Sequence, residues 1–267
     1  PMLRSVLLKT LHDQRRSVGG WVVAITILVL MSAAIWPSIR DQPSMSDFLE
    51  QMPEAFRSLF ATSGADMSTP VGYIQIELMS FMGPILLILY AVGQGSAAVA
   101  GEEDRHTLDL LLGAPLTRTR VVLEKAGAMV VGTVALAAVT GVALVLEGRF
   151  FDLDLPVGTT AAAMVHLALL GLVFGGVALA VGAATGNPGR SRGVAAGAAV
   201  VAYLVNGLGG MVDWLRPFQR FSPFYQYVGH DPLRAGISWP GVGIATGTFL
   251  VLVALAVWGF RRRDVRG

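Results

Sequence analysis

The sequence predicts an all-α integral membrane protein with six transmembrane helices in a single transmembrane domain, residues 1–267. Three observations support this prediction. Hydrophobic residues make up 54% of the chain and charged residues 14%, whereas a typical soluble domain has about 25% charged residues. Six apolar runs each approach the ~20 residues that a helix needs to cross a bilayer. Basic residues gather at the ends of these runs, which is typical of membrane topology and not of a nucleic-acid-binding patch.

The first 17 residues predict an interfacial helix on the cytoplasmic leaflet. Four apolar residues fall on one helical face, and basic residues accompany them: Leu3, Val6, Leu7 and Leu11, with Arg4, Lys9, Arg15 and Arg16. The alternative is a plain polar tail. The apolar run that follows, about 18–39, is too long for a secretory signal, and five more runs follow it.

The other spans are expected at about 73–100, 121–146, 160–184, 193–212 and 241–260. A Gly83-Pro84 pair should kink the second span. An acidic stretch with an amphipathic piece, 40–72, joins the first two spans and suits the outer side. An aromatic and proline-rich stretch, 213–240, precedes the last span and suits the membrane–water boundary.

The distribution of basic residues predicts which side each loop faces. Alternate segments starting with the N-terminus hold 14 Lys and Arg residues, and the other three loops hold 6. This bias places both termini and the polar stretch 101–125 in the cytoplasm. An even number of spans requires the two termini to lie on the same side, so the bias also supports the count of six.

The stretch 101–125 is the most polar long segment between apolar runs. Three carboxylates (Glu102, Glu103, Asp104) precede a Leu-rich turn, and Gly113 and Pro115 then interrupt it before a basic cluster of Arg118, Arg120 and Lys125. This pattern predicts a cytoplasmic helix that docks on another protein. The alternatives are a solvated loop with an acidic helix start and, for the basic cluster, an anchor at the lipid headgroups.

Catalytic and nucleotide-binding motifs are absent from the sequence. The chain has no P-loop, no Gly-Lys pair, no H-E-x-x-H and no recognisable Ser/His/Asp set. Its four His residues are widely separated and it has no Cys, so neither a metal cluster nor thiol chemistry is indicated by spacing. We therefore expect no catalytic, cofactor-binding or metal-binding residues, and any energy-dependent work would draw on a partner.

The polar stretch resembles the signature region of ABC-2 type permeases, the membrane subunits of a class of ABC transporters. The matching residues are Glu102, Glu103, Thr107, Leu108, Leu111, Leu112, Pro115, Arg118 and Lys125. His106 stands where the family usually has Gly. Further similarities bring the resemblance to nearly the whole chain: residues 52–60 (MPEAFRSLF), Ser222-Pro223-Phe224, Asp231-Pro232-Leu233, Gly236 and the terminal run 260–264.

The resemblance implies the ABC-2 or G-subfamily-like (type V) exporter fold. It implies a multi-pass permease subunit of the plasma or inner membrane that is not itself an enzyme. Two such subunits, identical or different, would rest on separate ATPase subunits that bind ATP and Mg. A coupling helix between spans 2 and 3 would contact the ATPase, through Glu102, Glu103, Asp104, Thr107, Leu108, Leu111, Leu112, Pro115 and Arg118.

Few polar residues lie within the predicted spans. Glu77 is the candidate for gating or the substrate pathway, because a carboxylate in a membrane helix is costly, although it would also fit the outer interface. Gln94, His166 and Asn206 are expected to form interhelical hydrogen bonds. The glycine runs 171–176 and 207–210 are expected at close helix contacts, and Arg261, Arg262 and Arg263 in a positive-inside anchor.

Two other functions compete with the exporter. An ATP-independent channel or secondary transporter would predict more charges within the membrane and repeated broken helices. A membrane scaffold would bind a soluble partner through residues 101–125 without transport. A membrane enzyme ranks last because the sequence has no catalytic set.

Overall fold

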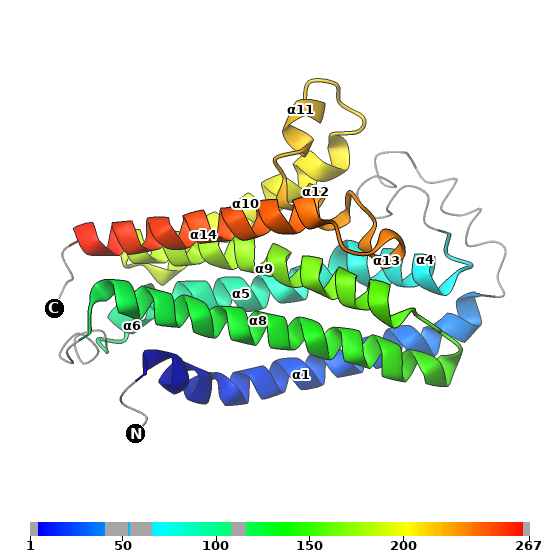
Figure 1. Ribbon diagram of the computed structural model, residues 1–267, viewed down its shortest axis with the longest axis horizontal. Coiled ribbons are helices and arrows are strands. Elements are labelled where there is room, and N and C mark those ends of the chain that lie inside the picture. The colour runs from blue at the N-terminus through cyan, green and yellow to red at the C-terminus, as the bar shows by residue number, and fades with distance from the viewer. Residues whose placement is uncertain (1–4, 41–52, 54–65, 108–115, 264–267) are drawn as a thin grey trace.

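The computed structural model describes residues 5–40, 53, 66–107 and 116–263, and every regular element in these ranges is a helix (Figure 1). Six helical stretches are long and apolar enough to cross a bilayer. They are α1 (Val6–Ile39), α4–η2–α5 (Pro70–Ile74, Gln75–Met82 and Gly83–Ala98), α8–η3 (Arg118–Gly148 and Arg149–Phe151), α9 (Val157–Thr185), α10 (Pro188–Leu208) and α14 (Trp239–Arg262). Four short helices connect them: α6 (Ala100–Asp104), α11 (Arg216–Gln219), α12 (Pro223–Val228) and α13 (Pro232–Ala235). The predicted fold class is confirmed.

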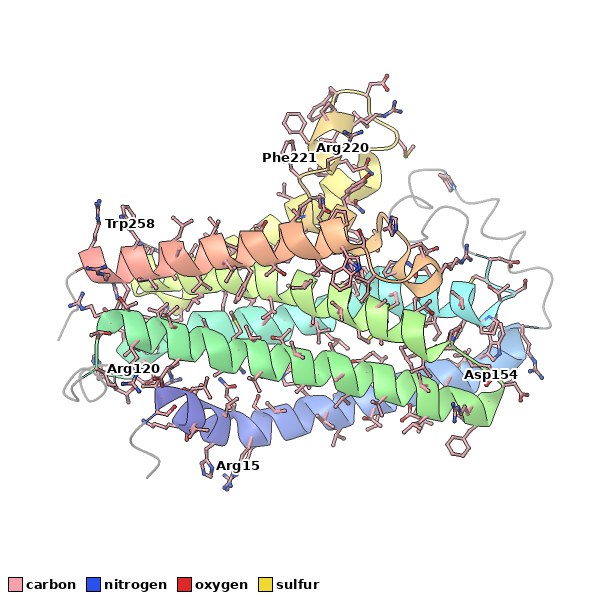
Figure 2. The ribbon with its side chains drawn as sticks, in the orientation of Figure 1. Arg15, Arg120, Asp154, Arg220, Phe221 and Trp258 are labelled. Carbon is pink, nitrogen blue, oxygen red and sulfur yellow. The ribbon has the colours of Figure 1, made fainter. Side chains whose placement is uncertain are left out.

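The long helices lie side by side, and the start of α1 and the end of α14 lie at the same end of the bundle (Figure 1). We call this the terminal end; it holds the start of α1, α6, the start of α8 and the last turn of α14. The opposite end, where α1 ends and η3 leads to α9, is the distal end. In Figure 2, Arg15 and Arg120 lie toward the terminal end and Asp154 at the distal end. The arrangement fits the predicted agreement between the two termini.

The predicted interfacial helix is not a separate element. Residues 6–17 are helical, but they form the first turns of α1, which continues without a break to Ile39 over 34 residues. A helix of this length spans about 50 Å, which exceeds the ~30 Å hydrocarbon core of a bilayer. The start of α1 is fastened to α8, because the Glu124 carboxylate accepts hydrogen bonds from the Leu7 N–H (2.9 Å) and the Ser5 hydroxyl (3.2 Å).

The second span is irregular where Gly83-Pro84 predicted a kink. The π-helix η2 ends at Met82, immediately before this pair. In a π-helix each carbonyl accepts from the residue five positions on, so Pro84, which has no N–H, leaves the Met79 carbonyl without its donor. The Tyr227 hydroxyl of α12 donates to that carbonyl at 2.9 Å. The irregular backbone is thereby tied to the segment between the last two spans.

The centre of the bundle is a close contact between α5 and α9 that depends on glycine. A Cβ added at Gly95 would lie 2.2 Å from the Gly175 carbonyl oxygen, and one added at Gly175 would lie 2.9 Å from Ala91 Cβ. Small residues let two helix backbones approach in this way in membranes. The expectation that the glycine run at 171–176 marks close packing agrees with this geometry.

Replacing Gly95 with Ala is expected to lower the free energy of unfolding by about 3 kcal/mol, because overpacking a rigid contact forces the two backbones apart. Gly93→Ala is the matched control on the same helix, since nothing lies within 4 Å of a Cβ at that position. Thermal unfolding of the two purified variants in detergent checks the prediction. Equal unfolding temperatures would show that the α5–α9 contact does not limit stability.

Candidate functional site

A short helix, α6, follows the second span at the terminal end and leads into the stretch singled out from the sequence. Its end has the hydrogen bonds of a Schellman motif. The Thr107 N–H donates to the Glu102 carbonyl at 2.9 Å, and the His106 N–H donates to the Glu103 carbonyl at 3.0 Å. His106 has a φ of 54°, in the left-handed region that this motif requires and that glycine adopts most easily. The left-handed turn explains why the ABC-2 pattern has Gly at the position that His106 occupies here.

Replacing His106 with Val is expected to lower the free energy of unfolding by about 1–2 kcal/mol, because a left-handed conformation is unfavourable for residues with a Cβ and most so for β-branched ones. His106→Gly should preserve the turn and serve as the control. The unfolding temperatures of the purified variants check this. The assigned turn would be contradicted if the Val and Gly variants were equally stable.

Glu102 forms a largely buried ion pair with Lys125 of α8. The Lys125 ammonium lies 2.5 Å from Glu102 Oε1, and the two side chains are 8% and 14% exposed. The other carboxylate oxygen accepts a hydrogen bond from the Thr107 hydroxyl. One carboxylate therefore joins α6, the turn after it and the start of the third span.

The environment of Glu102 sets its charge. Burial by itself raises the pKa of this carboxyl, but hydrogen bonds from Lys125 and Thr107 and the positive charges of Lys125 and Arg105 outweigh it, so the pKa lies below the usual 4.5. A lowered pKa in the folded protein stabilises the fold at neutral pH, and that contribution disappears as the pH falls below the ordinary carboxyl value through the lowered one.

The unfolding temperature should therefore fall as the pH drops from neutral to below 4.5, and part of this fall should be absent in Glu102→Gln. The variant starts from a lower unfolding temperature at neutral pH because the ion pair is already lost. Thermal unfolding across this range measures both effects. Parallel pH profiles for the two proteins would contradict the role of the Glu102 charge.

Glu103 forms a second ion pair, with Arg263 at the end of α14. Arg263 reaches both carboxylate oxygens, with Nη1 at 3.1 Å from Oε1 and Nη2 paired with Oε2. The two side chains are 10% and 18% exposed. Arg118 of α8 donates to the Phe260 and Arg263 carbonyls at 2.9 and 2.5 Å. The ends of the third and sixth spans and α6 therefore meet in one cluster.

Gly186, just after α9, makes room for this cluster. It has a φ of 65°. A Cβ at this position would lie 1.9 Å from Arg263 Nη1 and 2.6 Å from Glu103 Oε2. The fourth span thus borders the second ion pair through a residue without a side chain.

The family of the chain is shown by a comparison with known protein families. Residues 4–265 match the family described as ABC-2 family transporter protein. The chain belongs to the ABC-2 transporter family. It is therefore a multi-pass membrane protein and a permease subunit of an ABC transporter, and such subunits are not themselves enzymes and associate with an ABC ATPase. No curated protein matches the chain.

The site residues that were predicted from the sequence lie in different environments. Glu102, Glu103 and Thr107 join α6 to its neighbours, whereas Asp104 is exposed. The basic cluster is also engaged within the chain, since Arg120 pairs with Glu124 at 2.6 Å. Leu108, Leu111, Leu112 and Pro115 lie outside the described residues. Glu77 lies on η2, in the half of the second span that is remote from α6, and is exposed.

The contacts of three residues at the terminal end, Arg263, Glu124 and Gly186, were not predicted from the sequence. The run 261–263 was interpreted as a positive-inside anchor. Arg261 and Arg262 are exposed, but the pairing of Arg263 with Glu103 was not predicted. Glu124 and Gly186 were not singled out at all. Glu124 lies one turn after Arg120, a spacing that indicates their ion pair, but its contact with α1 has no local signal in the sequence.

Proposed function

We propose that this ABC-2 protein is the transmembrane permease subunit of an ATP-driven exporter, in which a separate ATPase subunit that binds ATP and Mg drives substrate movement across the membrane. The observation that supports this best is the pair of largely buried ion pairs, Glu102–Lys125 and Glu103–Arg263, which fix α6 to two membrane spans. α6 leads directly into the segment that the family pattern assigns to the ATPase contact.

The two carboxylates position the segment. Because Glu102 and Glu103 form ion pairs within the chain, direct contact with the ATPase is made by the residues that follow, beginning with the exposed Asp104. Leu108, Leu111, Leu112 and Pro115 supply an apolar face for a groove on the ATPase, and Arg118 closes the segment at the start of α8. Flanking charges set the register of such a contact.

The two ion pairs connect α6 to helices that cross the membrane. A shift of α6 by the ATPase acts on α8 through Lys125 and on α14 through Arg263, while Gly186 brings the end of α9 against the same cluster. Small displacements at such a cluster become movements of whole helices, because packed helices move as rigid elements. The terminal end then lies in the cytoplasm with the ATPase.

Glu77 is proposed to face the other permease subunit or the pathway that the two subunits share. It is exposed on this chain and lies in a span. A carboxylate directed at lipid is costly, and intramembrane acids commonly face a protein interior or a water-filled cavity. The second permease subunit, identical or related, would provide those surroundings.

Co-purification with the candidate ABC ATPase, followed by ATP hydrolysis measurements, tests this function. We expect the wild type to assemble with the ATPase and the double variant Glu102→Ala/Glu103→Ala to lose assembly or coupled hydrolysis. The control removes an exposed carboxylate at the distal end, Asp154→Ala, and should keep both properties. If no ATPase binds the wild type, the exporter function fails and a channel or scaffold takes its place.

A further inference from the structure

A polar cavity of about 220 Å³ lies at the terminal end, and both residues of the first ion pair, Glu102 and Lys125, line it. The start of α1, the end of α5, α6 and the start of α8 surround it, and these elements meet near the N-terminus in Figure 1. Its polar lining comes mainly from Asp13, Gln14, Gln94, Glu102, Arg105 and Lys125. Four elements thus contribute to a space that neither ion pair fills.

The cavity walls carry hydrogen-bonding groups that the described residues leave unused. Gln14 Oε1 is buried and has no hydrogen-bond partner among them. The Lys125 ammonium can donate three hydrogen bonds, and among the described residues it donates to Glu102. A buried polar group without a partner is unfavourable, so the cavity is suited to an occupant that accepts from Lys125 and donates to Gln14.

The charges around the cavity identify the chemistry of that occupant. Two carboxylates, Asp13 and Glu102, balance two cations, Arg105 and Lys125. The side chain of Arg105 is 60% exposed, and its contact with Glu102 is long, at 3.8 Å. The guanidinium therefore remains able to bind an anionic group. Asp13 and Gln14, both on α1, supply acceptors for an ammonium on that side of the cavity.

The depth of the cavity matches the headgroup layer. It lies where α1 passes beyond its apolar part, beside the exposed basic residues Arg15 and Arg16. Basic side chains at this position on a membrane helix lie at the level of the lipid phosphates. The cavity therefore lies at the level of the lipid headgroups.

We propose that this cavity binds a zwitterion that carries a phosphate and a primary ammonium, and that a phosphoethanolamine lipid headgroup is its source. The phosphate contacts Arg105 and Lys125, and the ammonium donates to Gln14 Oε1 and Asp13. The occupant touches both α1 and α6 and so adds a third tie between α6 and a membrane span. The site shares Glu102 with the coupling segment, but its occupant is a small zwitterion and not the ATPase.

Thermal unfolding of the purified protein in detergent, with added lipid, tests the site. Phosphatidylethanolamine at saturating concentration should raise the unfolding temperature by about 5 °C. Phosphatidylcholine should raise it less, because its quaternary ammonium has no N–H to donate to Gln14. The variant Gln14→Leu should lose the difference between the two lipids, and the exposed control His12→Leu should keep it.

Soluble phosphoethanolamine identifies the source of the ligand. If it stabilises the wild type no better than inorganic phosphate, the ligand is the lipid; if it matches phosphatidylethanolamine, the same site takes a free zwitterion. Native mass spectrometry should also show phosphatidylethanolamine retained by the wild type and lost from Gln14→Leu. Equal responses to both lipids, or an unchanged response in Gln14→Leu, would overturn the proposal. Because no readout involves the ATPase, this result is separate from the outcome for the exporter function.

Discussion

Replacing Lys125 with Ala should lower the free energy of unfolding by about 3–5 kcal/mol, because removing one partner of a buried ion pair leaves the other charge buried and uncompensated. The uncompensated group here is Glu102, whose side chain is 14% exposed. The same change should abolish the coupling of ATP hydrolysis to the permease, since α6 would lose its tie to α8. Unfolding in detergent and the ATPase rate of the assembled complex measure the two effects.

Two further variants separate the ion pair from a general effect of losing a lysine. The exchanged pair Glu102→Lys/Lys125→Glu keeps both charges and should recover part of the stability lost in Lys125→Ala. Arg120→Ala removes a cation of the same helix whose side chain is 52% exposed, and exposed pairs contribute little. The importance of the Glu102–Lys125 pair would be refuted by a Lys125→Ala variant as stable as Arg120→Ala.

Replacing Gly186 with Ala should disrupt the second ion pair from outside. The new Cβ would lie 1.9 Å from Arg263 Nη1 and 2.6 Å from Glu103 Oε2, so both side-chain ends must shift, and we expect their ion pair to be disrupted. We expect the free energy of unfolding to fall by about 3 kcal/mol, which combines the strain of a left-handed Ala with the loss of a buried charge partner. Unfolding and coupled ATP hydrolysis are again the measurements.

Gly236→Ala is the matched control for Gly186→Ala. Gly236 also has a positive φ, of 82°, but nothing lies within 4 Å of a Cβ at that position. Gly236 combines this φ with a ψ of −150°, a region essentially restricted to Gly, whereas Gly186 lies in the left-handed region. The control therefore carries at least as much backbone strain without the displaced ion pair, and it should retain coupling. If both variants lose coupling, strain alone explains the effect and the Glu103–Arg263 pair has no separate role.

The spans could be predicted from sequence because crossing a bilayer demands long apolar runs, and each predicted span overlaps a long helix. The first helix shows what local patterns leave open. The amphipathic pattern of the first 17 residues suggested a separate interfacial helix, but residues 6–17 are continuous with the first span in α1. Glu124 contacts the start of α1 from 117 positions away in the sequence, a distance at which local patterns give no signal.

The candidate site was located from sequence, but its internal contacts were not. The three consecutive acids were predicted together as a contact with a partner protein. Successive residues of a helix point about 100° apart, so Glu102 faces α8, Glu103 faces the end of α14 and Asp104 stays exposed. Their partners lie 23 and 160 residues away, a distance at which local spacing gives no signal. The left-handed turn at His106 was not predicted either, although the Gly of the family pattern at this position was a signal for it.

Site-specific cross-linking from the exposed residue of α6 tests the central claim most directly. The chain has no Cys, so Asp104→Cys provides a single reactive thiol next to the predicted ATPase contact, and Asp154→Cys provides the same thiol at the distal end. In membranes that contain both proteins, we predict that Asp104→Cys cross-links to the ABC ATPase, with a yield that changes on ATP binding, and that Asp154→Cys does not. Absence of a cross-link from position 104, or equal cross-linking from both positions, would contradict the account.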